Sequence, residues 1–165
     1  MKLSSVLKYW LPVLVWIGFV FWMSTGSFSP QKTSSVLEPL LRFLFPSISQ
    51  VELESVHAVT RKLAHIVEFF IGGLLLFRAF RSGSWHARSW RWAILAAISV
   101  VLIGVMDELH QYFVMTRNGS LADVGVDFIG GVLAQLFCVT YFQRSLQLKR
   151  RVGEVLPSRD RKSVV

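Results

Sequence analysis

The sequence predicts an all-α protein, an integral membrane four-helix bundle, and three observations support this. The 165 residues are 53% hydrophobic, and the mean hydropathy of +0.49 is high for a soluble domain of this size. Several apolar segments have lengths near the roughly 20 residues that cross a bilayer as a helix. Six Trp and thirteen Phe add the aromatic content expected near membrane interfaces. We expect the spans at about 7–25, 61–80, 92–111 and 123–142.

The distribution of charge predicts the orientation of these helices. The formal net charge is +8, and basic residues gather near the N-terminus, between Arg78 and Arg91, and after Arg144. Because basic loops are retained on the cytoplasmic side, we expect both termini in the cytoplasm. The same clustering argues against a nucleic-acid patch, so no nucleic-acid partner is expected. Cys138 is the single cysteine, which excludes a disulfide framework and a cysteine zinc site.

The first apolar segment has two interpretations. Lys2 and Lys8 followed by an apolar run would fit a cleaved signal peptide. The run is rich in Trp and Phe and lacks an A-x-A-like cleavage site. These features favour a retained membrane helix.

The connection 28–60 is long but carries helical signals. Apolar residues recur at helical spacing between Pro30 and Pro46, namely Val36, Leu37, Leu40, Leu41, Leu44 and Phe45. This pattern predicts a short amphipathic helix in the first outward loop, on the membrane surface or packed over the bundle. Ser49 and Glu52 match a capping box. The second spanning helix is therefore expected to begin well before residue 61.

The second half of the chain contains two further spans and a tail. Segment 113–122 includes Arg-Asn-Gly-Ser, which predicts a tight connection. Gly130, Gly131 and Ala134 would allow close approach between helices. We expect residues 1–143 to form the four-helix domain. Residues 144–165 would then be a basic cytoplasmic tail, disordered beyond its first turn or two.

Polar residues occur where three of the predicted spans meet the outer surface. On the second span, His57, Arg61, His65 and Glu68 advance by four, four and three residues, so they share one face. The third span ends with Asp107, Glu108 and Gln111, and the fourth begins with Asp123 and Asp127. Ionisable groups within membrane helices cost about 2.5–3.5 kcal/mol each on insertion scales, so they are candidates for function. The predicted topology brings all three groups to one outward-facing level.

This polar cluster is compatible with several roles. The groups could be inter-helix ion pairs that fix register. A divalent metal is disfavoured because no HExxH or two-metal spacing is present, so no metal and no cofactor are expected. His65 with Glu68 or Asp107 could transfer protons, with His65 and Asp107 preferred. Arg61, Lys62 and Arg117 could hold a phosphate or carboxylate. A proton or ion path is disfavoured because the polar residues stay on one side.

At these residues the chain resembles the VanZ-like family of small membrane proteins. The resemblance lies in Arg61-Lys62-x-x-His65-x-x-Glu68, in Asp107-Glu108-x-x-Gln111, in Arg117-x-x-Ser120-x-x-Asp123 and in the small-residue helix that follows. It covers roughly residues 61–135, with a matching first helix upstream. One departure is Asp127, where the family usually has Asn, so a role for an amide does not carry over.

The resemblance implies a multi-pass protein of the bacterial inner membrane and a link to glycopeptide (teicoplanin) resistance. We interpret the cluster as a site that binds or modifies a cell-envelope component. The partners would be membrane lipid and a lipid-linked or anionic envelope precursor, or a glycopeptide antibiotic. Non-catalytic binding, a structural role and a small transporter are the alternatives. The candidates for chemistry are His65, Glu68, Asp107, Glu108, Gln111 and Asp123. The candidates for substrate binding are Arg61, Lys62, Arg117, Ser120 and Asp127.

Overall fold

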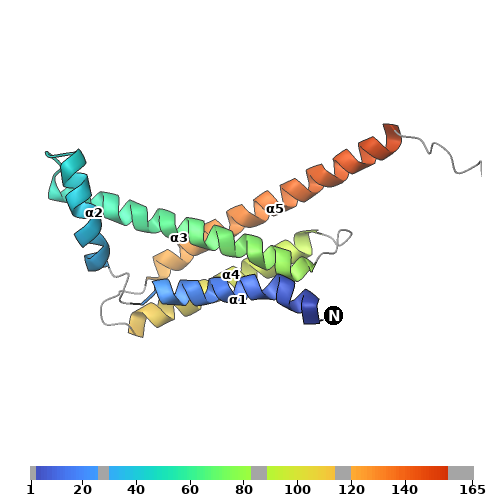
Figure 1. Cartoon of the computed structure of the whole chain (residues 1–165), viewed down its shortest axis with the longest axis horizontal. Coiled ribbons are helices and arrows are strands. Elements are labelled where there is room, and N and C mark those ends of the chain that lie inside the picture. The colour runs from blue at the N-terminus through green and yellow to red at the C-terminus, as the bar shows by residue number, and fades with distance from the viewer. Residues whose placement is uncertain (1–2, 26–29, 83–88, 114–119, 156–165) are drawn as a thin grey trace, which may run out of the picture.

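The computed structural model describes residues 3–25, 30–82, 89–113 and 120–155. This part of the chain is all-α, with five helices in the order α1 (Leu3–Met23), α2 (Pro30–Leu44), α3 (Gln50–Arg81), α4 (Ser89–Phe113) and α5 (Leu121–Val155). Every helix except α2 is long and apolar enough to cross a membrane. The prediction of an all-α multi-pass membrane protein is confirmed, and its orientation in the membrane stays a prediction. α1 begins and α5 ends at the same end of the bundle (Figure 1).

Helix α3 is the central element, and the capping box predicted from sequence sets where it begins. The Ser49 backbone N–H donates to Glu52 Oε2 (2.9 Å) and the Glu52 N–H donates to Ser49 Oγ (3.3 Å). Ser82 ends the helix in the left-handed region with φ 45°. The 32 residues of α3 extend for about 48 Å at 1.5 Å per residue. A hydrocarbon core of about 30 Å leaves roughly three turns of α3 outside it.

Glycines bring α5 close to its neighbours, as the small residues predicted. A Cβ added at Gly130 would lie 2.4 Å from the Ile66 carbonyl oxygen on α3, and one at Gly131 would lie 2.6 Å from Val100 on α4. Only a glycine fits at such distances. Asp127 precedes Gly130 by about one helical turn, so this packing also carries Asp127 into the space between α3 and α4.

Helix α1 packs into the core, as expected for a retained helix. Val13, Trp16 and Val20 are buried. The Trp16 indole N–H donates to the Glu68 carbonyl oxygen (3.1 Å), and its ring occupies the space beside Gly72. The ring also meets Phe69 edge-on at 5.7 Å between centroids. These contacts fix α1 against the middle of α3.

Two further predictions concern the segment between Pro30 and Pro46 and the segment after Arg144, and only the first is confirmed. The amphipathic helix expected between Pro30 and Pro46 is present as α2, which lies across the beginning of α3 (Figure 1). Its Val36, Leu40 and Phe43 side chains are exposed. The tail was expected to lose helical structure within a turn or two of Arg144, and this is wrong. α5 continues as a helix to Val155.

Candidate functional site

The buried polar residues gather at one end of the bundle, where α1 and α4 end and α5 begins (Figure 1). Among the described residues, the buried polar side chains at this end are Ser24, His65, Asp107, Glu108, Gln111, Asp123 and Asp127. They come from α3, α4, α5 and the residue that follows α1. The convergence predicted from the sequence is therefore present, and we call this set the polar end.

Two contacts join α3 to α5 within the polar end. The imidazole Nδ1 of His65 lies 2.8 Å from Asp127 Oδ1, and Asp127 is fully buried. Arg61 Nη2 donates to Asp123 Oδ2 over 2.7 Å. The repeat of four residues explains both contacts, because Arg61 and His65 share one face of α3 while Asp123 and Asp127 share one face of α5.

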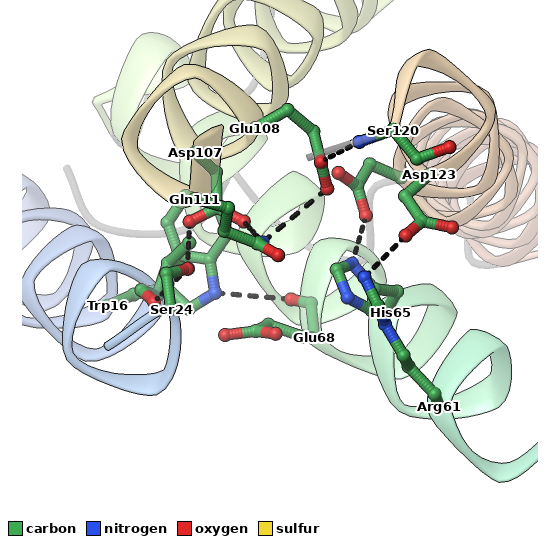
Figure 2. A network of polar contacts seen from close by, with 12 residues as sticks. Trp16, Ser24, Arg61, His65, Glu68, Asp107, Glu108, Gln111, Ser120 and Asp123 are labelled. Carbon is green, nitrogen blue, oxygen red and sulfur yellow. Dashed lines mark hydrogen bonds and ion pairs between the residues drawn. The ribbon is translucent and has the colours of Figure 1, made fainter. Parts of the chain in front are cut away.

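The carboxylate that contacts His65 comes from α5. We expected His65 and Asp107 to act together in proton transfer, which stays a prediction, and the carboxylate in contact with His65 is that of Asp127. Asp107 instead accepts a hydrogen bond from the Ser24 hydroxyl and one from Gln111 Nε2 (2.8 Å). The close α3–α5 approach at Gly130 brings Asp127 to His65. Figure 2 shows the result as two groups, one around Asp107 and one around His65.

Glu108 joins the Asp107 group to the residue before α5. Its carboxylate accepts from the Ser120 backbone N–H (2.5 Å) and, more weakly, from Gln111 Nε2 (3.4 Å) (Figure 2). Ser120 is also the residue before α5, where its hydroxyl accepts from the Ala122 N–H (3.2 Å). Glu108 therefore ties the end of α4 to the start of α5, and Ser120 serves as a cap at that start.

A cavity of about 380 Å³ opens beside these groups, between α2, α3, α4 and the end of α1. It is lined by Met23, Ser24, Ser34, Leu37, His57, Ala58, Thr60, Arg61, Ala64, His65, Glu68, Asp107 and Gln111. The predicted stripe His57, Arg61, His65 and Glu68 thus faces one cavity. A ligand in it would meet polar groups on one wall and apolar side chains on another.

Two residues that line the cavity each carry a buried nitrogen atom with no hydrogen-bond partner among the described residues. One is Arg61 Nε, whose guanidinium uses Nη2 for Asp123. The other is His57 Nε2. Buried polar groups are normally satisfied by protein, water or ligand. An arginine has five N–H donors, so Arg61 can hold Asp123 and an acceptor in the cavity at the same time.

The remaining candidates lie elsewhere. Lys62 is exposed and does not line the cavity. Arg117 lies outside the described residues. The contacts of Ser120 are made within the protein, so they neither support nor exclude its predicted role in substrate binding.

One three-residue group could hold a metal ion. His65, Glu108 and Asp127 each offer one ligand atom within 4.8 Å of the others. The residues come from three helices, so no local sequence motif identifies them.

The family of the chain follows from a comparison that covers this whole site. The family model described as VanZ/LLP1 matches residues 9–143. The chain belongs to the VanZ/LLP1 family. This confirms the resemblance drawn from the motifs between Arg61 and Asp123. No curated protein and no solved structure matched the chain.

Within the VanZ/LLP1 region, sequence reasoning missed the contribution of Ser24 and of helix α2. Ser24 is 3% exposed and donates to Asp107, while Ser34 and Leu37 line the cavity. The position of Ser24 at the end of an apolar segment was the available signal, because a hydroxyl at that level can reach charged groups on neighbouring spans. No sequence signal placed Ser34 and Leu37 at the cavity.

Proposed function

We propose that this VanZ/LLP1 protein binds the anionic headgroup of a lipid-linked cell-envelope component in the cavity beside the polar end. The observation that carries the proposal is the unpartnered, buried Nε of Arg61, a residue that lines the cavity. A phosphate or carboxylate oxygen would satisfy this donor with a charge-assisted hydrogen bond. His57 Nε2, also buried without a partner, would supply a second contact.

The surroundings of the cavity fit an amphiphilic ligand. Met23, Leu37 and Ala64 contribute apolar lining, and the cavity lies at the end of α1 and α4 rather than midway along them. A headgroup at this level would leave its hydrocarbon chain beside the apolar helix surfaces. Helix α2 carries exposed Phe43 and Leu40, which suit the boundary between headgroups and acyl chains.

Native mass spectrometry with undecaprenyl phosphate as the probe tests this binding. Arg61→Gln should weaken the apparent affinity for the lipid by more than about tenfold, which is the loss expected for a charge-assisted hydrogen bond. The fraction of protein with bound lipid reports this loss. Lys62→Gln is the matched control, because it removes an adjacent cation that is exposed and outside the cavity. It should reduce binding by less than about threefold. Equal losses from both variants would contradict a site at Arg61.

The His65–Asp127 contact favours a second step, proton transfer to or from the bound headgroup. Asp127 fixes Nδ1 of the imidazole, which leaves Nε2 for exchange with a ligand in the cavity that His65 lines. His65→Gln should then retain lipid binding and lose proton exchange with the bound headgroup. If the wild-type protein binds the probe without exchanging a proton with it, the site binds its ligand without acid–base chemistry.

The arrangement of polar groups gives less support to transport. Among the described residues, Gln135 is the single buried polar side chain outside the polar end, and it donates to the Gly73 carbonyl oxygen (3.1 Å). A transporter would need polar groups along both halves of its path. We therefore favour a site that acts on one membrane surface.

The outward orientation of this site is part of the proposal. In a Cys138→Ala background, Ala122→Cys near the polar end should react with an impermeant maleimide added outside intact cells. Arg144→Cys at the other end of α5 should react only after permeabilisation. Both positions are exposed, and the reverse pattern would place the site in the cytoplasm.

The link to glycopeptides follows from the same location. A protein that sequesters or alters lipid-linked precursors at the outer face of the membrane would change susceptibility to an antibiotic that binds them there. Expression should raise the inhibitory concentration of teicoplanin, and Arg61→Gln should abolish the increase. An unchanged inhibitory concentration would remove the resistance role and leave the lipid-binding proposal standing.

A further inference from the structure

A second set of buried, unpartnered atoms lies at the polar end beside the cavity. These atoms are hydrogen-bond acceptors. Asp127 is fully buried, and its Oδ2 has no hydrogen-bond partner among the described residues. Gln111 is 1% exposed, and its Oε1 is also unpartnered. The Gln111 amide cannot be reversed to relieve this, because its Nε2 donates to the carboxylates of Asp107 and Glu108. Buried acceptors without donors call for a proton, a water molecule or a cation at this place.

From these atoms we propose that His65, Glu108 and Asp127 bind one divalent transition-metal cation, of the Zn²⁺ or Mn²⁺ class. One ligand atom from each residue lies within 4.8 Å of the other two. Around a shared ion with bonds of 2.0–2.2 Å, ligand atoms are about 3.0–3.5 Å apart. His65 Nδ1 and Asp127 Oδ1 are already 2.8 Å apart, so only the more widely separated ligand atoms would have to approach, by about 1–2 Å at most. The imidazole favours Zn²⁺ over Mg²⁺ and Ca²⁺, which prefer oxygen ligands alone, while the two carboxylates also suit Mn²⁺.

The balance of charge at the polar end gives an independent reason. Four carboxylates are buried there, those of Asp107, Glu108, Asp123 and Asp127. Among the described residues, Arg61 is the permanent cation that contacts one of them, Asp123. Uncompensated carboxylates between membrane helices are costly, so they require a cation or bound protons. A divalent ion held by His65, Glu108 and Asp127 would neutralise these two carboxylates, which contact neither an arginine nor a hydroxyl group.

The contacts of the other two acids separate them from the metal site. Asp107 has both oxygens engaged, with Ser24 and Gln111. Asp123 is paired with Arg61 at 2.7 Å. Neither belongs to the group whose ligand atoms converge. Asp123 is therefore the matched control for Asp127, since it lies one turn earlier on the same face of α5.

The metal site goes beyond the proposed lipid binding and does not rest on it. A metal bound by His65 would compete with the proton-transfer role of the same imidazole. It would leave Arg61 and His57 free to bind an anion in the cavity. Titration with the metal alone therefore fails or succeeds independently of the binding of undecaprenyl phosphate.

Isothermal titration calorimetry on the untagged full chain in nanodiscs, first stripped with a chelator, tests the site. Zn²⁺ or Mn²⁺ should bind with a stoichiometry of one. Asp127→Asn, which keeps the size of the side chain, should weaken binding by more than about tenfold. Asp123→Asn should change it by less than about threefold. Glu108→Gln provides a second ligand variant if Asp127→Asn does not fold.

The outcomes decide the proposal. Saturable binding that depends on Asp127 or Glu108 but not on Asp123 supports it. Absence of saturable binding by the wild-type protein overturns it and leaves protons as the counter-charge. Binding that is equal in the wild-type protein and in the ligand variants overturns it as well, because the metal would then lie elsewhere.

Discussion

The two ends of the helix bundle accommodate polar side chains in different ways. At the polar end, carboxylates of α4 and α5 are buried between helices and held by Ser24, Arg61 and His65. At the opposite end, cationic side chains lie against aromatic rings near the helix termini. Arg78 is exposed and lies 5.3 Å from the ring centroid of Tyr9. Long basic side chains can reach water from such positions with little desolvation.

The interior shows the same contrast. Toward the end opposite the polar end, the core consists of apolar side chains such as Leu76 and Phe77, each 2% exposed. Packing of this kind is sufficient to hold membrane helices together. Buried acids between membrane helices are costly, and apolar packing of this kind does not explain them, which supports a role with a ligand. Three substitutions test this division between packing and function.

The largest effect is expected where α5 touches α3. Gly130→Val would place a side chain against the Ile66 backbone, whose carbonyl oxygen lies 2.4 Å from the added Cβ position. We expect a loss of at least about 3 kcal/mol in stability, at the upper end of overpacking effects. Gly125→Val is the control on the same helix, because a Cβ there meets no atom within 4 Å. Thermal unfolding in detergent measures both, and equal melting temperatures would contradict this packing.

A smaller loss is expected at the polar end from Ser24→Ala. This change removes the hydroxyl that donates to the buried Asp107 carboxylate, and hydrogen bonds to charged groups contribute about 1.5–3 kcal/mol. Ser99→Ala is the matched control, since the Ser99 hydroxyl is exposed and bonds the Leu95 carbonyl oxygen of its own helix (2.9 Å). A Ser24 variant as stable as the Ser99 variant would show that Asp107 does not depend on this contact.

The smallest effect is expected from Gln135→Leu, deeper in the bundle. Gln135 donates to the Gly73 carbonyl oxygen (3.1 Å), while its own Oε1 is buried without a partner among the described residues. Leucine removes both the bond and the unsatisfied acceptor, so the two effects offset each other to within about 1 kcal/mol. A destabilisation larger than that of Ser24→Ala would show that polar contacts also hold the middle of the bundle.

The sequence was sufficient for features that depend on local spacing. The capping box at Ser49 and Glu52, the amphipathic helix after Pro30 and the stripe from His57 to Glu68 each arise within a few turns of one helix. Each could therefore be recognised without knowledge of the neighbouring helices. The convergence of acids at one end followed from the number of spans and the lengths of their connections.

Pairing between helices could not be predicted in the same way. The contact of His65 with Asp127 depends on the approach of α5 to α3, which Gly130 sets. Spacing along the sequence shows which residues share a face, but not the rotation of that face relative to another helix. Ser24 was missed for the same reason, because its role depends on where α1 ends relative to Asp107.

The central claim is that an anionic headgroup satisfies the unpartnered Arg61 Nε, and solid-state NMR tests it most directly. Rotational-echo double resonance between ¹⁵N-labelled arginine and the ³¹P of undecaprenyl phosphate measures this distance in nanodiscs. The account predicts dephasing that corresponds to about 4 Å or less, as a direct N–H···O–P contact requires. The signal should be absent in Arg61→Gln and retained in Lys62→Gln. Saturation with lipid and no dephasing from Arg61 would contradict the account.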